Sequence, residues 1–270
     1  MVDFATELAV ARAAARAAGR IAHDMQGRAA RSDKADGSPV TEGDFAADRA
    51  IQGAIRSSFP QDAILSEETP DDGARCHAQR LWIIDPIDGT REYAAGRPGW
   101  CVQIALAVAG RIVLGVLDQP SRNTSWWGVP GHGAWSDYDG TTSPLVLPTA
   151  GVSNVLVTGS STRNRAAGLA VRAALPGFAG INEHSVGIKV TRILEGDADL
   201  YVHARFIHAW DAAAPAAVLV AAGGQATDLA GHELVMNGLD ERQPGLLFSR
   251  RNDHRDLALR LANAGIRCTD

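Results

Sequence analysis

The sequence predicts an α/β protein in which an α+β half is followed by a half of alternating strands and helices. Three observations support this expectation. Two segments near the N-terminus repeat apolar residues at helical spacing, short apolar runs with the length of strands follow, and from about residue 155 the two patterns alternate. We therefore expect an N-terminal α+β subdomain over residues 1–148 and a C-terminal α/β subdomain over residues 149–270.

Two helices are expected at the N-terminal end. Residues 3–26 form an alanine-rich amphipathic segment, and a polar loop containing Gly and Pro follows at residues 31–39. The second helix should begin at Thr41, because Asp44 stands three residues later, as in a capping box. Apolar residues then recur on one face of this helix as far as Phe59.

The rest of the N-terminal half is expected to form strands. Candidate strands lie at residues 63–66, 81–84, 100–108 and 112–117, with shorter ones around Trp126 and Ala134. The first two runs end directly before carboxylates, which is typical of buried strands. The next two flank an Ala-Gly-Arg turn and predict a hairpin. A polar stretch at residues 137–143 then ends this half.

The C-terminal half alternates between the two patterns. We expect strands at residues 155–158, 200–203 and 226–229. We expect helices at residues 164–174, 186–194, 212–222 and 254–263. Such alternation is typical of an α/β layer.

The composition is that of a globular protein with a small acidic excess. The 270 residues are 46% hydrophobic and 21% charged, with a formal net charge of −5. A dedicated nucleic-acid binder normally carries a basic excess, so this balance argues against one. No run approaches the ~18 apolar residues of a membrane span, and the N-terminal residues lack the order of a secretion signal. The three cysteines are too few and too widely spaced for a disulfide framework, so we expect a cytoplasmic protein.

The stretch WIIDPIDGT at residues 82–90 is the most informative part of the chain. An apolar strand places Asp85 at its C-terminal end, and Asp88 follows after a turn. Two carboxylates this close repel each other unless a cation lies between them, and oxygen ligands select hard ions such as Mg²⁺. The backbone N–H groups of Gly89 and Thr90, at a helix start, would suit a phosphate. A capped turn without a metal would use the same residue types.

Two further acidic positions resemble this one. Glu67 and Glu68 follow the apolar run at residues 63–66, and Asp211 follows Trp210 at the start of an apolar helix. Taken separately, the two glutamates could be solvated and Asp211 could be an ordinary helix cap.

Taken together, these three motifs are similar to those of the inositol monophosphatase superfamily of lithium-sensitive, Mg²⁺-dependent phosphatases. The family pattern is an acidic pair after a strand, then DP(I/L)DGT, then WD before small residues, and all three occur here in order. The resemblance implies the layered αβαβα sandwich of the inositol monophosphatase and fructose-1,6-bisphosphatase type. It also implies two or three Mg²⁺ ions per active site, a small phosphate ester as substrate, and a homodimer.

The resemblance further implies a role for each matching position. Glu67, Asp85 and the carbonyl of Ile87 would hold a first metal ion. Asp85, Asp88 and Asp211 would hold a second one, so that most ligands come from the first subdomain and Asp211 completes the site from the second. This division of ligands is the two-metal scheme for displacement at phosphorus.

The same resemblance implies the catalytic groups. Thr90 would orient the attacking water, helped by Asp44 in the segment PVTEGD at residues 39–44. Glu67 would act with them through the metal that activates this water. No protein nucleophile is expected, because the two-metal scheme needs none.

Within the superfamily the sequence most resembles bacterial 3′(2′),5′-bisphosphate nucleotidases of the sulfate-assimilation type. The resemblance lies in DGTREY at residues 88–93, in GIK at 187–189 with EGDADLY at 195–201, and in SSTRN at 160–164. It implies 3′-phosphoadenosine 5′-phosphate as the substrate. Cationic and polar side chains would contact its second phosphate, and the candidates are Ser160, Arg163, Lys189 and Arg205.

Several departures from the nucleotidase pattern keep other functions open. Cys101 and Gln103 lie where these enzymes show an F-T-V-N-like strand, Ala212 replaces a threonine, and residues 203–209 match poorly. One alternative is an inositol-1-phosphate or histidinol-phosphate phosphatase. Another is a phosphatase dedicated to a nucleotide or sugar phosphate of a biosynthetic pathway. A catalytically silent metal- or nucleotide-binding regulator is the alternative from a different class.

Overall fold

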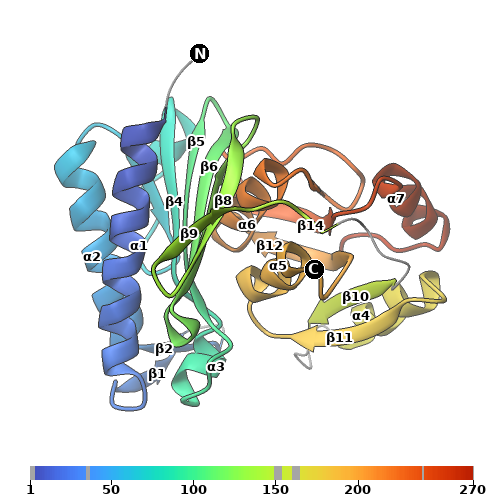
Figure 1. Cartoon of the computed structure of the whole chain (residues 1–270), viewed down its shortest axis with the longest axis horizontal. Helices are drawn as coiled ribbons and strands as arrows, with labels where there is room; N and C mark the ends of the chain where they lie inside the picture. Colours follow the sequence, from blue (N-terminus) through green and yellow to red (C-terminus); the bar gives the residue numbers. More distant parts are fainter. Residues whose placement is uncertain (1–3, 35–36, 149–153, 160–164, 239, 270) are drawn as a thin grey trace.

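The fold consists of five layers of helices and sheets. The computed structural model of the chain describes residues 4–34, 37–148, 154–159, 165–238 and 240–269. Helices α1 (Ala5–Met25) and α2 (Glu42–Ser58) cover one face of the first sheet. Helices α5 (Val186–Glu195) and α6 (Ala209–Ala221) lie between the two sheets, and α4 (Arg165–Ala174) and α7 (His254–Asn263) lie outside the second (Figure 1). This arrangement is the αβαβα sandwich predicted above.

The first sheet has seven strands in the order β3-β4-β5-β6-β7-β8-β9. Its strands are β3 (Ala63–Ser66), β4 (Arg80–Asp88), β5 (Cys101–Val108), β6 (Arg111–Gln119), β7 (Thr124–Val129), β8 (Gly133–Tyr138) and β9 (Thr141–Pro144). The β3–β4 pair is parallel, and each later pair is antiparallel. The expected strands and the hairpin are confirmed. The polar stretch at residues 137–143, for which no strand was predicted, forms the β8–β9 hairpin, and its outer strand is exposed throughout and therefore lacks an apolar signal.

The second sheet has five strands in the order β11-β10-β12-β14-β13. Its strands are β10 (Val155–Gly159), β11 (Ala179–Glu183), β12 (Leu200–His208), β13 (Gln225–Thr227) and β14 (Arg242–Ser249). Strand β10 is parallel to β11 and β12, whereas β14 is antiparallel to β12 and β13.

Sequence reasoning missed β11 and β14 and ended β12 five residues early, at residue 203. Strand β11 lies at an edge and is mostly exposed, so it shows no alternation. Strand β12 contains an irregularity in its pairing with β14 between His203 and Phe206, which interrupts the period of two. Helix α6 consequently begins directly after β12, at Ala209 rather than at residue 212.

A two-stranded ribbon lies between the first two helices. Its strands are β1 (Arg31–Asp33) and β2 (Pro39–Thr41), which pair antiparallel. Residues 31–39 were predicted to form a loop, but residues 31–33 and Pro39 belong to these strands. Each strand has three residues and β1 is exposed throughout, so neither could produce a recognisable pattern.

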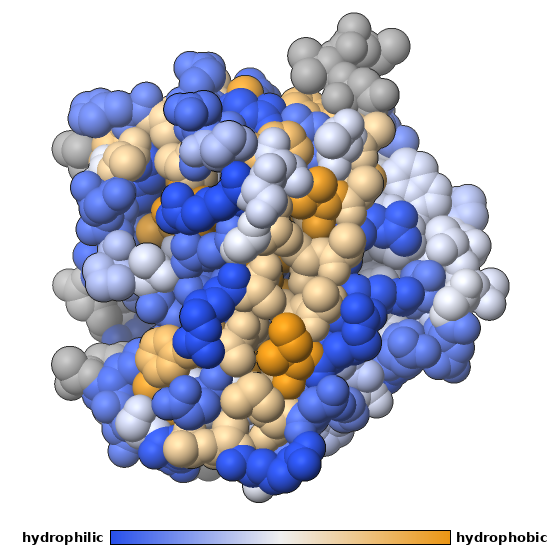
Figure 2. All heavy atoms as spheres, turned by 90° about the vertical axis from the view of Figure 1, so that its left-hand side faces the viewer, coloured by the Kyte–Doolittle hydropathy of each residue, from blue (hydrophilic) through white to orange (hydrophobic). Residues whose placement is uncertain are grey.

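Small residues form the buried side of α1. The outward side of this helical layer is shown in Figure 2, where a band of apolar surface runs between charged side chains. The buried residues of α1 are Ala11, Ala14, Ala15, Ala18, Gly19 and Ala22. Such small residues let the helix lie close to the sheet.

The spacing and the capping box expected for α2 are confirmed, because Thr41 and Asp44 exchange the two capping hydrogen bonds.

One apolar core joins the two sheets through the middle helices. Leu81 and Ile83 of β4 belong to the same buried cluster as Val190 of α5, Val218 of α6 and Phe248 of β14. The two halves are thus packed on a shared core. In the part of the chain that the structure describes, no helix is long and apolar enough to cross a membrane.

Candidate active site

An irregularity in β4 brings two aspartates to one side of the sheet. Asp85 pairs with Gln103 and Asp88 pairs with Cys101, so two residues on β4 stand opposite one residue on β5. Side chains three residues apart on a regular strand point to opposite faces, and the extra residue cancels this alternation. Asp85 and Asp88 are 1% and 5% exposed. The DPID motif is therefore a strand end that presents both carboxylates at one site.

A third carboxylate enters from the other half of the chain. Asp211 lies in the first turn of α6, whose N-cap is His208, so Asp211 is not the cap itself. Its carboxylate oxygen lies within 4.8 Å of those of Asp85 and Asp88. Burial and the neighbouring negative charges raise the pKa of both Asp85 and Asp211 well above the ordinary value.

This carboxylate cluster fits a hard divalent cation. Its three residues offer only oxygen atoms, which is the ligand type that Mg²⁺ prefers over the nitrogen and sulfur sites of softer metals. Three carboxylates this close in a mostly buried place cannot all be ionised without a compensating positive charge. The cluster therefore has two properties that a magnesium site requires: its ligand atoms are carboxylate oxygens, and its negative charges need a cation to balance them.

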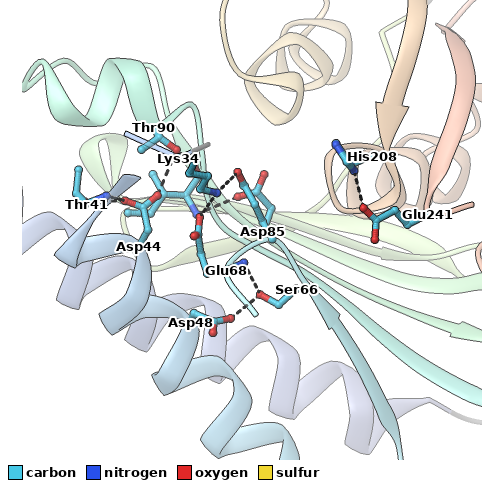
Figure 3. Close-up of polar contacts among 12 residues, drawn as sticks. Lys34, Thr41, Asp44, Asp48, Ser66, Glu68, Asp85, Thr90, His208 and Glu241 are labelled. Atoms are coloured by element: carbon cyan, nitrogen blue, oxygen red, sulfur yellow. Dashed lines mark hydrogen bonds and ion pairs between the residues drawn. The ribbon is translucent and has the colours of Figure 1, made fainter. Parts of the chain in front are cut away.

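Thr90 lies beside this cluster at the start of a short helix, α3 (Thr90–Ala94), as the sequence predicts. Its hydroxyl Oγ1 is 3.2 Å from Asp44 Oδ1 and 3.1 Å from the carbonyl oxygen of Ile87. One hydroxyl hydrogen thus faces two acceptors. Burial raises the pKa of Asp44 to about 6, although hydrogen bonds from Thr41 act in the opposite direction. The structure brings Thr90, Asp44 and Ile87 into one hydrogen-bonded group, of which Figure 3 shows Thr90 and Asp44.

The acidic pair after β3 is held by a lysine that sequence reasoning missed. Lys34 Nζ donates to Glu67 Oε1 at 2.7 Å and to Glu68 Oε1 at 2.8 Å; Figure 3 shows Lys34 and Glu68. The Glu68 side chain is only 3% exposed, and its burial raises its pKa to about 7. Lys34 is one of only two lysines in the sequence, and this rarity is the feature by which the sequence could have drawn attention to it. The ammonium neutralises charge at Glu67, which the resemblance assigns to the first metal.

Glu67 and Glu68 line a cavity of about 370 Å³. Trp210 and Glu241 line the same cavity from the C-terminal half. The imidazole of His208 stacks on Trp210 with ring centroids 4.2 Å apart, and its Nδ1 lies 3.3 Å from Glu241 Oε1 (Figure 3). A larger hollow of about 430 Å³ is lined mainly by apolar residues and by neither Glu67 nor Glu68. The acidic cavity is the better candidate for a phosphate ester held by metals.

The residues expected to contact the substrate are distributed unevenly. Lys189 is buried at 3% exposure, so it is not a charge on the surface of its helix. Its Nζ donates to the carbonyl of His184 at 2.9 Å and lies 5.0 Å from the ring centroid of Tyr201. Burial lowers the pKa of Lys189, while the carboxylates of Asp88 and Asp211 oppose this shift. Its ammonium is thus close enough to the cluster to interact with it electrostatically.

Of the other three candidates, the structure describes only Arg205. Arg205 is half-buried on β12 and forms an isolated bridge with Thr269 near the C-terminus. Ser160 and Arg163 lie outside the described residues.

Sequence reasoning also missed the residues that surround Asp88. Its Oδ2 accepts hydrogen bonds from the Gln103 side chain, from the Ser185 hydroxyl at 2.6 Å and from the Gly187 N–H at 2.6 Å. Ser185 and Gly187 belong to the start of α5, 97 and 99 positions along the chain from Asp88. Contacts over such separations leave no pattern in a single sequence.

Comparisons with known proteins agree with this architecture. The sequence model of the inositol monophosphatase family matches residues 3–265 of this chain. A 3'-phosphoadenosine 5'-phosphate phosphatase of Mycobacterium leprae is 38% identical over 211 residues, which are 77% of this chain and 76% of that protein. A Streptomyces griseus protein named glucose-1-phosphate thymidylyltransferase is 35% identical over 255 residues, or 90% and 92% of the two chains. The crystal structure of CysQ from Bacteroides thetaiotaomicron superposes with a TM-score of 0.77 at 27% identity and covers 92% of this chain and 99% of that one.

Proposed function

Because the chain belongs to the inositol monophosphatase family of phosphoric monoester hydrolases, we propose that it removes a phosphate from a bisphosphorylated nucleotide. We favour 3′-phosphoadenosine 5′-phosphate as the substrate. The observation that carries this proposal is the 38% identity to a Mycobacterium leprae enzyme named for that substrate. The segments at residues 88–93 and 195–201, which resemble bisphosphate nucleotidases, support it.

The metal in this proposal is Mg²⁺, with two or three ions in each active site. Glu67, Asp85 and the Ile87 carbonyl would hold the first ion, and Asp85, Asp88 and Asp211 would hold the second. Bound there, magnesium would lower the pKa of a water molecule and neutralise charge on the phosphate and the leaving oxygen. The clustering of Asp85, Asp88 and Asp211 supports the second set. Lys34, which pairs with Glu67, would have to release that carboxylate.

The protein groups in this mechanism position water and substrate. When the Ile87 carbonyl is engaged as a ligand, the Thr90 hydroxyl gives its single hydrogen to Asp44. The Thr90 oxygen then has lone pairs available to accept a hydrogen bond from the attacking water, which orients that water toward phosphorus. Asp44 and Glu67 complete the catalytic set. The backbone N–H groups of Gly89 and Thr90 would contact the scissile phosphate.

The leaving group would lie against the C-terminal half. Lys189 and Arg205, with Ser160 and Arg163, would contact the second phosphate of the substrate. The burial of Lys189 close to Asp88 and Asp211 supports its place in this set, because a cation there attracts an anionic ligand toward the metal centre.

A panel of phosphate esters tests the proposal. Phosphate release would be measured with Mg²⁺, with and without chelator, on 3′-phosphoadenosine 5′-phosphate, inositol 1-phosphate, histidinol phosphate, fructose 1,6-bisphosphate and adenosine monophosphate. We expect activity that requires Mg²⁺ and a kcat/KM at least tenfold higher on the bisphosphate nucleotide than on the other esters. A higher kcat/KM on inositol or histidinol phosphate would reject the substrate assignment.

A further assay tests for the activity after which the Streptomyces griseus relative is named. Glucose 1-phosphate would be supplied with thymidine triphosphate, and a sugar nucleotide would be sought by chromatography. We expect no such product. Its formation would reject the phosphatase proposal in favour of nucleotidyl transfer.

We also propose that the enzyme is a cytoplasmic homodimer inhibited by lithium, with subdomains over residues 1–148 and 149–270. The dimer and the lithium inhibition follow from the family resemblance, the cytoplasmic location from the sparse cysteines, and the subdomains from the change of pattern near residue 150. Light scattering on the purified protein tests the dimer, and a lithium titration of the phosphatase assay tests the inhibition.

A further inference from the structure

The carboxylate of Asp88 is held through one of its two oxygens. Three donors converge on Oδ2: the amide Nε2 of Gln103, the Oγ of Ser185 and the backbone N–H of Gly187. Gln103 lies on β5 of the first sheet, whereas Ser185 and Gly187 lie at the start of α5 in the other half of the chain. This single oxygen therefore joins two elements that are distant in the sequence.

The convergence determines which oxygen remains for a ligand. A carboxylate offers about two lone pairs on each oxygen, so three donors saturate Oδ2. Rotation of the carboxylate would break all three hydrogen bonds at once. The hydrogen bonds from Gln103, Ser185 and Gly187 and the contact of the Cys101 sulfur all reach Oδ2, and the backbone N–H of Val186 also faces this carboxylate. Oδ1 is thus the oxygen available to the cluster formed with Asp85 and Asp211.

The side chain that donates to Asp88, Gln103, has a second polar atom without a partner among the described residues. Its side chain is fully buried, and its Oε1 has no hydrogen-bond partner among the described residues. A buried acceptor without a partner costs about 1–3 kcal/mol. A residue selected for packing alone would be apolar at this position, so the donation to Asp88 explains the glutamine.

Ser185 and Gly187 are built into the same contact. The Ser185 oxygen accepts the N–H of Ile188 at 3.0 Å as the N-cap of α5, so its only hydrogen is left for Asp88. Gly187 can approach because it has no side chain, since a Cβ there would lie 2.3 Å from the Cys101 sulfur. The start of α5 thus faces Asp88 through a serine hydroxyl and a backbone N–H.

We infer that Gln103 and Ser185 are positioning residues for the second metal: they fix Asp88 so that Oδ1 faces the cluster, and they dock α5 onto the metal-binding strand. This inference rests on the proposed role of Asp88 as a metal ligand. Hydrogen-bonding partners of metal ligands typically contribute 10- to 100-fold to metal affinity.

The test measures Mg²⁺ affinity rather than turnover. Gln103→Met keeps the length and volume of the side chain and removes the donor. We expect calorimetric titration of the metal-free protein to give a Kd for Mg²⁺ raised about tenfold. The melting temperature of the metal-free variant should be unchanged or higher, because the unpartnered acceptor is removed together with the donor.

A matched control is available in the same sheet. Gln119 is also a buried glutamine with an unpartnered Oε1, but its amide donates to the carbonyl of Pro98. Gln119→Met should leave the Mg²⁺ affinity within twofold of the parent. Ser185→Ala should weaken Mg²⁺ binding as Gln103→Met does, and it provides the same readout if Gln103→Met does not fold.

Two outcomes separate the inference from the proposal beneath it. If Asp88→Asn abolishes high-affinity Mg²⁺ binding while Gln103→Met and Ser185→Ala bind like the parent, the positioning role is rejected and the metal site stands. If Asp88→Asn binds Mg²⁺ like the parent, the proposed metal site itself is rejected.

Discussion

The two halves of the chain contribute to the site through different kinds of structure. The N-terminal half presents Asp85 and Asp88 from one strand of a seven-stranded sheet, where both residues pair with β5 beyond Ile84, the last residue that pairs with β3. The C-terminal half contributes from the first turns of two helices, with Asp211 on α6 and Ser185 at the start of α5. The sheet therefore sets the position of Asp85 and Asp88, and α6 completes the carboxylate cluster from the other half of the chain.

The largest expected effect comes from removing the carboxylate that crosses between the halves. Asp211→Asn keeps the shape of the side chain but removes the negative charge that the C-terminal half adds to the cluster. We expect kcat on the best substrate to fall roughly 1,000-fold, which corresponds to about 4 kcal/mol of transition-state stabilisation. Steady-state kinetics with Mg²⁺ measures the loss, and circular dichroism checks that the fold is retained.

Asp228→Asn is the matched control for this variant. Asp228 is another aspartate of the C-terminal half, but its carboxylate accepts hydrogen bonds from the N–H and the ring of His232. We expect its kcat to stay within about threefold of the parent. An Asp211→Asn enzyme as active as the Asp228→Asn enzyme would mean that the sheet alone holds the metals.

Sequence reasoning was more accurate for the first half than for the second, for a physical reason. The strands of the first sheet are long, mostly hairpin-connected and apolar, so period and turn chemistry identify them. In the second sheet, β11 is a mostly exposed edge strand and β12 is irregular between His203 and Phe206, so neither has a clear period. The two halves thus differ in how much of their structure is determined locally.

The same distinction applies within the site. Asp85, Asp88 and Asp211 could be found because each lies in a short motif at the end of a strand or the start of a helix. Gln103 and Ser185 reach Asp88 across 15 and 97 positions of the chain, and no local pattern marks such contacts. The register of β5 on β4 and the docking of α5 determine them.

A second prediction distinguishes a structural carboxylate of the first sheet from the proposed metal ligands. Asp118 of β6 is buried beneath α1, and burial raises its pKa to about 6 although Arg16 and Arg20 oppose the shift. Because this value exceeds the roughly 3.9 of an unfolded chain, the associated stability is complete below pH 4 and is lost as the pH rises through 6. Asp118→Asn should escape this loss and be more stable than the parent at pH 8 by about 2 kcal/mol. Urea unfolding of the metal-free protein measures this difference.

The pH dependence of this stability difference tests whether the buried charge of Asp118 causes it. The advantage of Asp118→Asn should shrink by about 1 kcal/mol between pH 8 and pH 5, as the parent carboxylate takes up a proton. Asp137→Asn is the control with the opposite sign. Burial would raise the pKa of Asp137, but hydrogen bonds from Arg16 and Gly140 lower it, so this substitution should destabilise the protein at pH 8. A stabilising Asp137→Asn would reject the electrostatic explanation for both residues.

The smallest expected effect concerns substrate selection by the C-terminal half. Lys189 is buried on α5, and we propose that its ammonium contacts the second phosphate of the substrate. Lys189→Met should raise KM for 3′-phosphoadenosine 5′-phosphate about tenfold, equivalent to about 1.4 kcal/mol, because one charged contact is lost. KM for adenosine monophosphate, which lacks the second phosphate, should change less than threefold. Steady-state kinetics on the two substrates measures this split.

Arg192→Met is the control for the same helix, because Arg192 pairs with Glu183 and Asp197 at the protein surface. It should leave both KM values unchanged. An equal loss on both substrates in Lys189→Met would instead place Lys189 with the metal centre, where its charge acts on Asp88 and Asp211. In that case α5 would serve the metal through Lys189 as well as through Ser185, and selection between substrates would have to come from other residues of the C-terminal half.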